Sequence, residues 1–507
     1  MSPNRAKISY LYHLWSAIMK ESSCRKEKLM KTSRRLVEQS SIIASVAKWT
    51  FLSAVIGVLI GGIVTIFLKL LHYSEAHQGI FPFHFYYLLP LGLMFSVWIV
   101  RTFAPDAKGH GTEKVIEAVH KKDGKIDLAV IPVKLLATVV TLFTGGSAGK
   151  EGPGAQIGAG TASAISDFLG FSKKDRKKLV VCGISAGFAT VFGTPIAGAI
   201  FGVEVLIVGT LMYDLLLPSI VAGFTAFFTA QYLGATYTYY DISYFQHYFI
   251  DIVLIMKVML GGVFFGLVAY LIVATLKQIE HIVQKLKMDP YKKAFLAGLL
   301  LVLLSFAVGD RFFGLGLDTI AQAMRLESSA GQDIPWYAFI MKIFYTAVTL
   351  GSGGSGGIVT PIFYIGATSG HLFGGLFGGE HQLTLFAALG FVSVLAAATN
   401  APIAATIMAM ELFGMDVAHY AAVSIVISFL VLGHRSVFPS QKISMSKSDL
   451  LEIEYGDDIE HSSVSLTEEN SKQFREIQRQ IRLRRLKRAN REKIEKKREN
   501  REPPKES

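Results

Sequence analysis

The sequence predicts an all-α integral membrane protein built from two related halves. Of its 507 residues, 51% are hydrophobic and only 18% are charged, whereas soluble domains carry about 25% charged residues. Several apolar stretches approach or exceed the roughly 20 residues that cross a bilayer; they cover 51–71, 86–100, 252–276 and 294–308. A third observation, a long internal repeat, indicates the two halves. Many membrane crossings are needed to hold these stretches.

The two ends of the chain are hydrophilic and are both expected on the cytoplasmic side. Residues 1–50 contain ten Lys/Arg and three Asp/Glu, a bias typical of cytoplasmic segments. The first apolar run begins too late and is too long for a cleaved signal peptide. Residues 441–507 form a charged tail that either contacts anionic lipid or a partner or is simply solvated. Two cytoplasmic ends imply an even number of crossings.

The internal repeat aligns residues 131–160 with residues 338–368. Lys134 matches Lys342 and Pro153 matches Pro361, each 208 positions apart. In a second pair of segments, Glu204 matches Glu411 at a distance of 207 positions. Duplicated halves with Gly/Pro-interrupted apolar segments are typical of transporters whose site lies at the repeat interface. The alternative is a duplicated structural unit without a transport role.

Glycine-rich turns open three apolar segments, at 108–119, 146–160 and 354–368. A helix that begins in the membrane needs a partner for its free N–H groups, and an anion is one such partner because the helix start carries partial positive charge. Glu151 lies at one of these starts, where its carboxylate competes with an anion and protonation releases it, so it is a candidate gate. The alternative is that Glu151 caps its own helix. Lys150 either steers anions or extends to the interface.

Other classes of protein fit the sequence less well. The stretch GGSAGK resembles part of a phosphate-binding loop, but Thr144 and Glu151 stand where that motif needs glycine and Ser/Thr. The histidines lack metal-ligand spacing, and Cys24 and Cys182 are too few for a disulfide framework. The sequence therefore predicts no enzyme, no cofactor, no metal site and no nucleic-acid partner. A non-transport membrane scaffold stays open as a rival class.

With these motifs, the chain resembles the CLC family of chloride channels and chloride/proton exchangers over about residues 44–440. The sequence GKEGP (149–153) is similar to the family's G-R/K-E-G-P motif, whose glutamate is the gate. The sequence GGIVTP (356–361) is similar to G-G-I-F-A-P, in which two amides hold the central anion; here these belong to Ile358 and Val359. The resemblance implies an inverted repeat of tilted and broken transmembrane helices, and a homodimer with one pore per subunit.

Three departures from the family pattern bear on mechanism. The segment GHGTE (109–113) replaces G-S-G-I-P, so His110 stands where a serine contributes a hydroxyl to the inner anion site. Phe438 replaces a tyrosine that points into the pore, and Val205 replaces the glutamate that relays protons in exchangers. A histidine near its usual pKa of about 6.5 can make transport pH-dependent, or its ring can turn away from the path. Glu204 is expected to be structural.

These observations predict a passive, gated chloride channel of CLC type, with a chloride/proton antiporter that bypasses Val205 as the alternative. The expected domains are a basic N-terminal segment (1–43), a transport domain (44–440, with repeats at 44–235 and 250–440) and a tail (441–507) without a paired nucleotide-binding module. Expected partners are chloride or a similar anion, protons, membrane lipid and a second copy. The residues expected to line the anion path are His110, Gly111, Gly149, Lys150, Gly152, Gly357, Ile358, Val359 and Phe438.

Overall fold

The computed structural model describes residues 3–467 except 81, 241–251, 325–333, 379–381 and 463. Side chains are described from residue 37 onwards, apart from those at 464 and 466. The expectation for the Cys24 thiol therefore concerns a side chain that is not described, and the charged tail beyond residue 467 lies outside the described residues.

The first half of the chain is helical. Its elements are α1 (Pro3–Ala76), η1 (Gln78–Ile80), η2 (Phe85–Leu88), α2 (Leu89–Phe103), η3 (Pro105–Ala107), α3 (Thr112–Lys121), α4 (Val130–Phe143), α5 (Glu151–Phe168), α6 (Lys173–Phe192), α7 (Pro195–Glu204), the short strand β1 (Ile207–Val208) and α8 (Tyr213–Tyr232).

The second half follows the same plan. Its elements are α9 (Ile252–Lys285), α10 (Pro290–Val308), α11 (Leu317–Ala323), α12 (Ala338–Gly351), α13 (Val359–Phe373), η5 (Gly374–Gly378), α14 (Leu383–Thr399), α15 (Pro402–Phe413), α16 (Met415–Leu432) and the strands β2 (Lys442–Ile443), β3 (Leu451–Ile453) and β4 (Val464–Leu466). The all-α class predicted from the sequence is confirmed.

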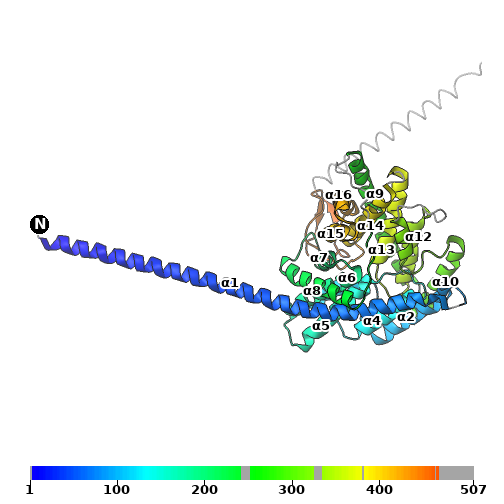
Figure 1. Cartoon of the computed structure of the whole chain (residues 1–507), viewed down its shortest axis with the longest axis horizontal. Helices are drawn as coiled ribbons and strands as arrows, with labels where there is room; N and C mark the ends of the chain where they lie inside the picture. Colours follow the sequence, from blue (N-terminus) through cyan, green and yellow to red (C-terminus); the bar gives the residue numbers. More distant parts are fainter. Residues whose placement is uncertain are drawn as a thin grey trace, which may run out of the picture.

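Among the described residues, six helices are long and apolar enough to cross a membrane. They lie at Val37–Ile80, Phe85–Phe103, Tyr213–Tyr232, Ile252–Lys285, Pro290–Val308 and Met415–Leu432. Other apolar helices, including α4, α7, α12 and α15, have only 10–17 residues and are too short to span the bilayer alone. Figure 1 shows these helices packed in one body, from which the N-terminal part of α1 extends as a long rod.

The repeat in the sequence is also a repeat of helices. Helix α4 begins at Val130 and α12 at Ala338, while α5 begins at Glu151 and α13 at Val359, each pair 208 residues apart by subtraction. Helices α5 and α6 pack closely, as do their repeat partners α13 and α14. Helices α13 and α14 are buried almost throughout, as are most of α5 and the part of α6 from Leu179 to Val191, so the core of the molecule is made of paired repeat elements.

Glycines allow these core helices to approach closely. A Cβ added at Gly158 would lie 2.3 Å from the Gly183 carbonyl oxygen, and one at Gly366 would lie 2.4 Å from the Gly390 oxygen. The two crossings match across the repeat. Small residues at such crossings are the usual means of close helix packing in membranes.

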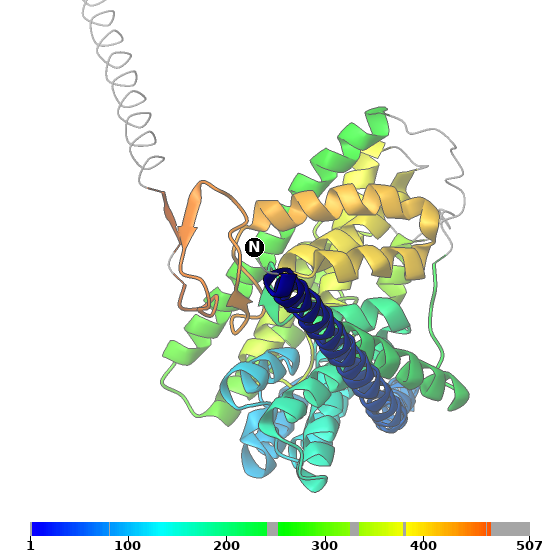
Figure 2. The same ribbon diagram turned by 90° about the vertical axis from the view of Figure 1, so that its left-hand side faces the viewer.

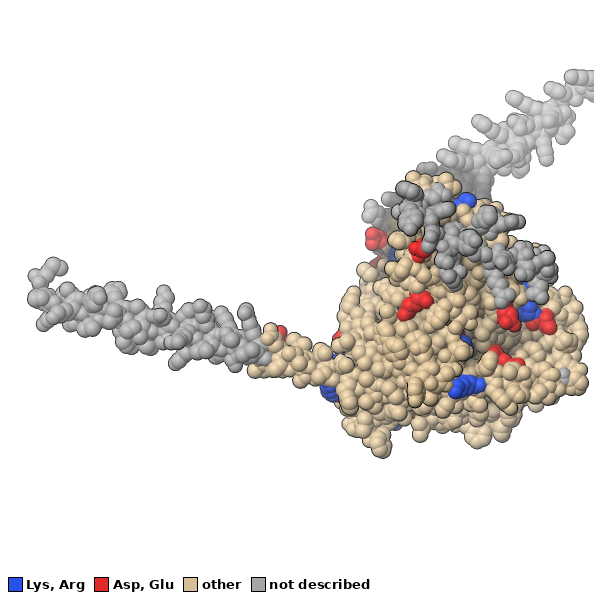
Figure 3. Space-filling model, in the orientation of Figure 1, with Lys and Arg blue, Asp and Glu red and all other residues tan. Residues whose placement is uncertain are grey.

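The outer surface of the body is mostly uncharged. Figure 3 shows few Lys, Arg, Asp and Glu side chains over the described part of the visible face. Large apolar side chains on α9 and α10 are solvent-accessible in the isolated chain; Met256, Leu303 and Phe306 are examples. An apolar exterior of this extent fits contact with lipid rather than water.

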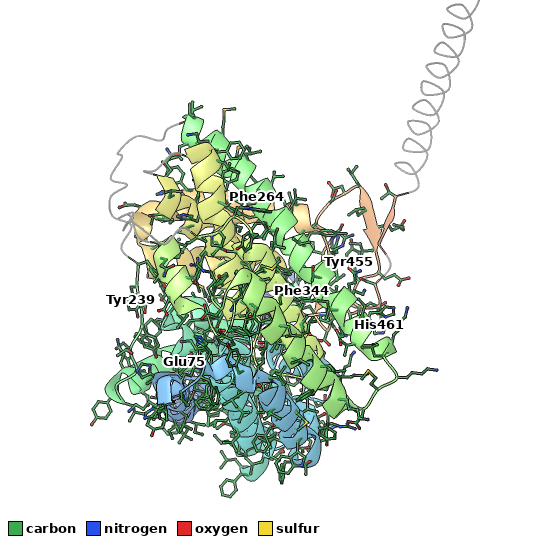
Figure 4. The ribbon with its side chains drawn as sticks, turned by 90° about the vertical axis from the view of Figure 1, so that its right-hand side faces the viewer. Glu75, Tyr239, Phe264, Phe344, Tyr455 and His461 are labelled. Carbon is green, nitrogen blue, oxygen red and sulfur yellow. The ribbon has the colours of Figure 1, made fainter. Side chains whose placement is uncertain are left out.

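The segment after α16 packs against the helical body. Strand β2 pairs in parallel with β1, which directly follows α7, and β3 pairs with β4 in an antiparallel hairpin. Figure 2 shows these strands against one side of the helical body, and Figure 4 marks the same segment by Tyr455 and His461. The predicted domain boundary at residue 440 falls within this packed segment, so the transport domain and the start of the tail are in continuous contact.

Candidate anion site

The two repeats meet at their glycine turns. The Gly149 amide donates to the Gly357 carbonyl at 2.7 Å, and the Gly357 amide donates to the Gly149 carbonyl at 2.6 Å. These two glycines occupy matching positions of the repeat, so the bonds are reciprocal. This pair marks the local two-fold relation between the halves and places the starts of α5 and α13 side by side.

Hydroxyl groups reinforce the same symmetry on the two turns. The Ser147 amide donates to Thr349 Oγ1 at 3.2 Å, and the Ser355 amide donates to Thr141 Oγ1 at 3.1 Å. Each repeat therefore supplies the acceptor for the other repeat's turn. Because these contacts are buried, they fix both helix starts in a rigid frame.

Glu151 reaches from the start of α5 to the start of α13. Its Oε2 accepts a hydrogen bond from the Thr360 amide at 3.0 Å. The Thr360 hydroxyl lies 2.7 Å from Oε1 and 2.6 Å from Oε2 of Glu151. The glutamate is buried, with 2% of its surface exposed. The carboxylate thus occupies the N-terminal end of the opposite repeat's helix, where an anion would bind, rather than capping its own helix.

Neighbouring amides at the start of α13 stay free to bind a ligand. Ile358 is the N-cap and Val359 is the first helical residue, and the Ile358 side chain makes no capping hydrogen bond. Within the described part of the chain, the amides of Ile358 and Val359 donate to no protein acceptor outside the helix. The first N–H groups of a helix have no intrahelical acceptor, so these two are available to an anion.

The start of α3 lies directly against this frame. A Cβ added at Gly152 would lie 2.0 Å from the His110 carbonyl oxygen, and one at Gly111 would lie 2.4 Å from the Gly152 oxygen. Gly111 also has a φ of 79°, which favours glycine. The structure therefore brings His110 and Gly111 to the residue that follows Glu151.

Two lysines hold the loops that carry this geometry. Lys134 Nζ donates to the carbonyls of Gly109 at 2.6 Å and Ala107 at 3.2 Å. Its repeat partner Lys342 donates to Gly314 at 2.8 Å and Phe312 at 3.1 Å. Both ammonium groups thus orient loops, which accounts for their matching positions. Lys150 is only partly buried, and its amide, 3.4 Å from Thr360 Oγ1, contacts the same hydroxyl as Glu151.

Glu204 and Glu411 cap each other's repeat. Glu204 accepts from the amides of Ile403 and Ala404 at 3.0 and 2.8 Å at the start of α15. Glu411 accepts from the amides at the start of α7, at 3.1 and 2.8 Å. A carboxylate at a helix start satisfies orphan N–H groups and matches the helix dipole. The geometry agrees with the structural role expected for Glu204.

The remaining predicted residues lie in the segment after α16 and at the end of α7. Phe438 is buried, and its amide donates to Ser436 Oγ at 3.0 Å. Val205 is buried as the C-cap of α7, and its carbonyl accepts from Gln441 Nε2 at 2.7 Å. Nearby, Ser440 donates through its amide at 3.0 Å and through its hydroxyl to Glu113 in the first turn of α3. This segment therefore links α3 to α7.

Sequence reasoning missed three residues of this region. Thr360 lies immediately before Pro361 in the glycine-turn motif, and a hydroxyl beside a helix start was a signal that could have identified it. Glu113 lies where the family motif has proline, a departure whose carboxylate was not considered. Gln441 gave no sequence signal, because its role depends on contacts with Val205 and Asn400 that are distant in the chain.

The chain matches the model of the voltage gated chloride channel family over residues 92–433. A chloride/fluoride channel protein of Pseudomonas syringae pv. tomato is 33% identical over 420 residues, which cover 82% of this chain and 90% of that protein. The chain belongs to the CLC family. This confirms the family resemblance and the CLC fold predicted from the sequence, and it makes the chain a multi-pass membrane protein for anion transport.

Solved CLC structures are similar to the chain. A CLC-type fluoride/proton antiporter superposes with a TM-score of 0.73 at 30% sequence identity, covering 78% of this chain and 98% of that chain. A slow cyanobacterial Cl⁻/H⁺ antiporter superposes with a TM-score of 0.64 at 19% identity, covering 76% and 94%. The second similarity supports the fold alone. Membership in this family of channels and transporters agrees with the absence of enzyme motifs in the sequence.

Proposed function

We propose that this CLC protein exchanges a small halide for protons, with Glu151 as the gate and fluoride as the preferred anion. The observation that carries the proposal is the carboxylate of Glu151 on the start of α13, where it accepts from both the amide and the hydroxyl of Thr360. An anion that enters must replace this carboxylate, and a proton on the carboxylate weakens its hold. One site therefore responds to both ions.

The choice of fluoride rests on chemistry and on similarity together. Fluoride is the smallest halide and the strongest hydrogen-bond acceptor, so it gains most from a site that offers a hydroxyl beside amides. Similarity to a protein named as a chloride/fluoride channel and to a fluoride/proton antiporter supports the same choice. The inner positions His110 and Phe438 supply no hydroxyl for chloride.

A second candidate function is the passive chloride conductance expected from the sequence. One observation favours it: Val205 cannot relay a proton, and its side chain is buried in the core. We also propose that two copies associate, each with its own pore, and that both termini face the cytoplasm.

The test uses purified protein in liposomes loaded with equal fluoride and chloride. Efflux of each anion is followed with ion-selective electrodes, with and without a protonophore. Valinomycin and potassium balance charge in every sample, and fluoride efflux that still requires the protonophore supports the exchanger, because protons taken up in exchange otherwise accumulate inside and stop it. Chloride efflux at the same or greater rate without the protonophore, given valinomycin and potassium to balance charge, supports the passive channel.

A further inference from the structure

Val205, which follows α7, cannot carry a proton, and Glu204 before it is engaged at the start of α15, but a third carboxylate is linked to this position. Gln441 donates to the carbonyl of Val205 at 2.7 Å, and the preceding residue, Ser440, contacts Glu113. At the other end of α3, His120 Nε2 lies 2.9 Å from the carbonyl oxygen of Leu206. Helix α3 thus runs alongside the residues that follow α7, and the consecutive residues Ser440 and Gln441 connect Glu113 to the Val205 carbonyl.

Only one of the two carboxylate oxygens of Glu113 accepts hydrogen bonds in the described structure. Oε1 accepts both the amide and the hydroxyl of Ser440, whereas the buried Oε2 has no hydrogen-bond partner among the described residues. No salt bridge to Glu113 is formed within the described part of the chain, because the adjacent Lys114 pairs with Glu117 at 2.7 Å. A buried carboxylate oxygen without a donor is costly, and protonation converts it to a donor.

The first turn of α3 connects this carboxylate to the gate. His110 contacts Gly152 next to Glu151 through its carbonyl, and Glu113 lies in the first turn of α3, which begins two residues after His110. The buried His110 Nδ1 and Thr112 Oγ1 also lack partners among the described residues. The only cation that bonds to this loop in the described structure, Lys134, is engaged with the carbonyls of Ala107 and Gly109. Three residues of the α3 start, His110, Thr112 and Glu113, therefore each carry a buried polar atom that is free to bind a proton or a water molecule.

We propose that Glu113 is the inner proton carrier of the exchanger, in place of the residue that Val205 cannot supply. This proposal rests on the exchange function proposed above. During one cycle the O–H bond on Glu151 breaks, its proton passes through water molecules that the unpaired atoms of the α3 start would bind, and an O–H bond forms on Glu113. Glu113 then releases the proton to the cytoplasmic solution and returns to a carboxylate. The sequence runs in reverse for the opposite direction of transport.

A purely structural role for Glu113 makes a different prediction. If the residue served only to hold Ser440, and through it the Phe438 segment, an isosteric amide would replace it. Glu113→Gln keeps an oxygen that accepts from Ser440 but cannot carry a proton. Ser440→Ala removes one donor of the anchor and leaves the carboxylate in place. The two variants therefore separate proton transfer from anchoring.

The experiment records anion efflux and proton movement together from liposomes that contain wild-type protein, Glu113→Gln, Ser440→Ala or Glu117→Gln. Glu117 is the matched control, since it is a glutamate on the same helix that pairs with Lys114. We expect proton movement per anion to fall at least tenfold in Glu113→Gln and to stay unchanged in Glu117→Gln and Ser440→Ala.

Each other result overturns a defined part of the account. An unchanged ratio of protons to anions in Glu113→Gln overturns the role of Glu113 while leaving the exchanger intact. Wild-type protein that moves anions without protons overturns the exchange function and the carrier with it. Equal loss of coupling in Glu113→Gln and Ser440→Ala assigns Glu113 to anchoring. Thermal unfolding of each variant in detergent excludes misfolding as the cause.

Discussion

Replacing Glu151 with glutamine tests the gate most severely, because the substitution keeps the shape of the side chain and removes its charge. In the structure, the Thr360 amide and hydroxyl both donate to the carboxylate. A hydrogen bond to a charged group contributes about 1.5–3 kcal/mol, against about 0.5–1.5 kcal/mol for a neutral pair. Loss of charge at two donors therefore weakens the hold of the gate by about 2–3 kcal/mol, or roughly 30- to 150-fold.

The expected result for Glu151→Gln is anion efflux at neutral pH that is at least about tenfold faster than in wild type. Efflux should no longer change with pH, and proton movement should cease, because no titratable group remains at the gate. The assay is fluoride and chloride efflux from liposomes between pH 5 and pH 8. Glu280→Gln, an exposed glutamate at the end of α9, is the matched control. Wild-type efflux with a wild-type pH response would refute the reasoning.

Three further predictions concern individual contacts. Thr360→Val keeps the amide but removes the hydroxyl that donates to Glu151, a loss of about 1.5–3 kcal/mol. Anion efflux at neutral pH should therefore rise about tenfold, whereas Thr360→Ser, which keeps a hydroxyl, should match wild type. Equal efflux rates for the two variants would contradict this. Glu411→Ala removes the cap of α7 at a cost of about 0.5–2 kcal/mol and should lower Tm in detergent. Glu411→Gln, which keeps an acceptor oxygen, should lower Tm less. An unaltered Tm in Glu411→Ala would show that the cap is energetically neutral. Lys342→Met leaves the carbonyls of Phe312 and Gly314 without their donor, at about 1–3 kcal/mol each. This variant should lower Tm more than Glu411→Ala does. A Tm equal to that of wild type would rule out a loop-holding role for Lys342.

Much of the fold follows directly from the sequence. The long apolar stretches correspond to candidate spans such as Ile252–Lys285 and Pro290–Val308, because lipid requires every backbone group to be bonded within a helix. The offset of 208 residues also carries into the structure, since matching positions such as Gly149 and Gly357 bond reciprocally. The two repeats keep the same residue types where they pack against each other, and a single sequence is enough to show this.

The partner of the candidate gate could not be found in the same way. The contact between Glu151 and Thr360 joins residues 209 positions apart, and it depends on the relative placement of two helix starts. The sequence located Glu151 at a helix start, but the carboxylate reaches the start of the other repeat's helix. A side chain's local position does not fix the direction in which it extends.

The packed segment after α16 was also hidden. Its composition is hydrophilic, and a hydrophilic run usually predicts a solvated tail. One of its anchors is Lys447, which is half-buried and donates to Asn400 and to the carbonyls of Phe429 and Gly433. Desolvation of the ammonium group lowers the pKa of Lys447 well below its ordinary value. A lysine with three protein acceptors helps to dock a segment, but composition alone does not reveal it.

The central claim is that anion and proton move in exchange through one site gated by Glu151. The most direct measurement imposes a fluoride gradient across proteoliposomes at equal pH and records the pH inside. We expect fluoride flow to drive protons against the gradient that develops, and Glu151→Gln to abolish this movement while fluoride still flows. Fluoride flow with no proton movement in wild-type protein would contradict the account and favour a passive channel.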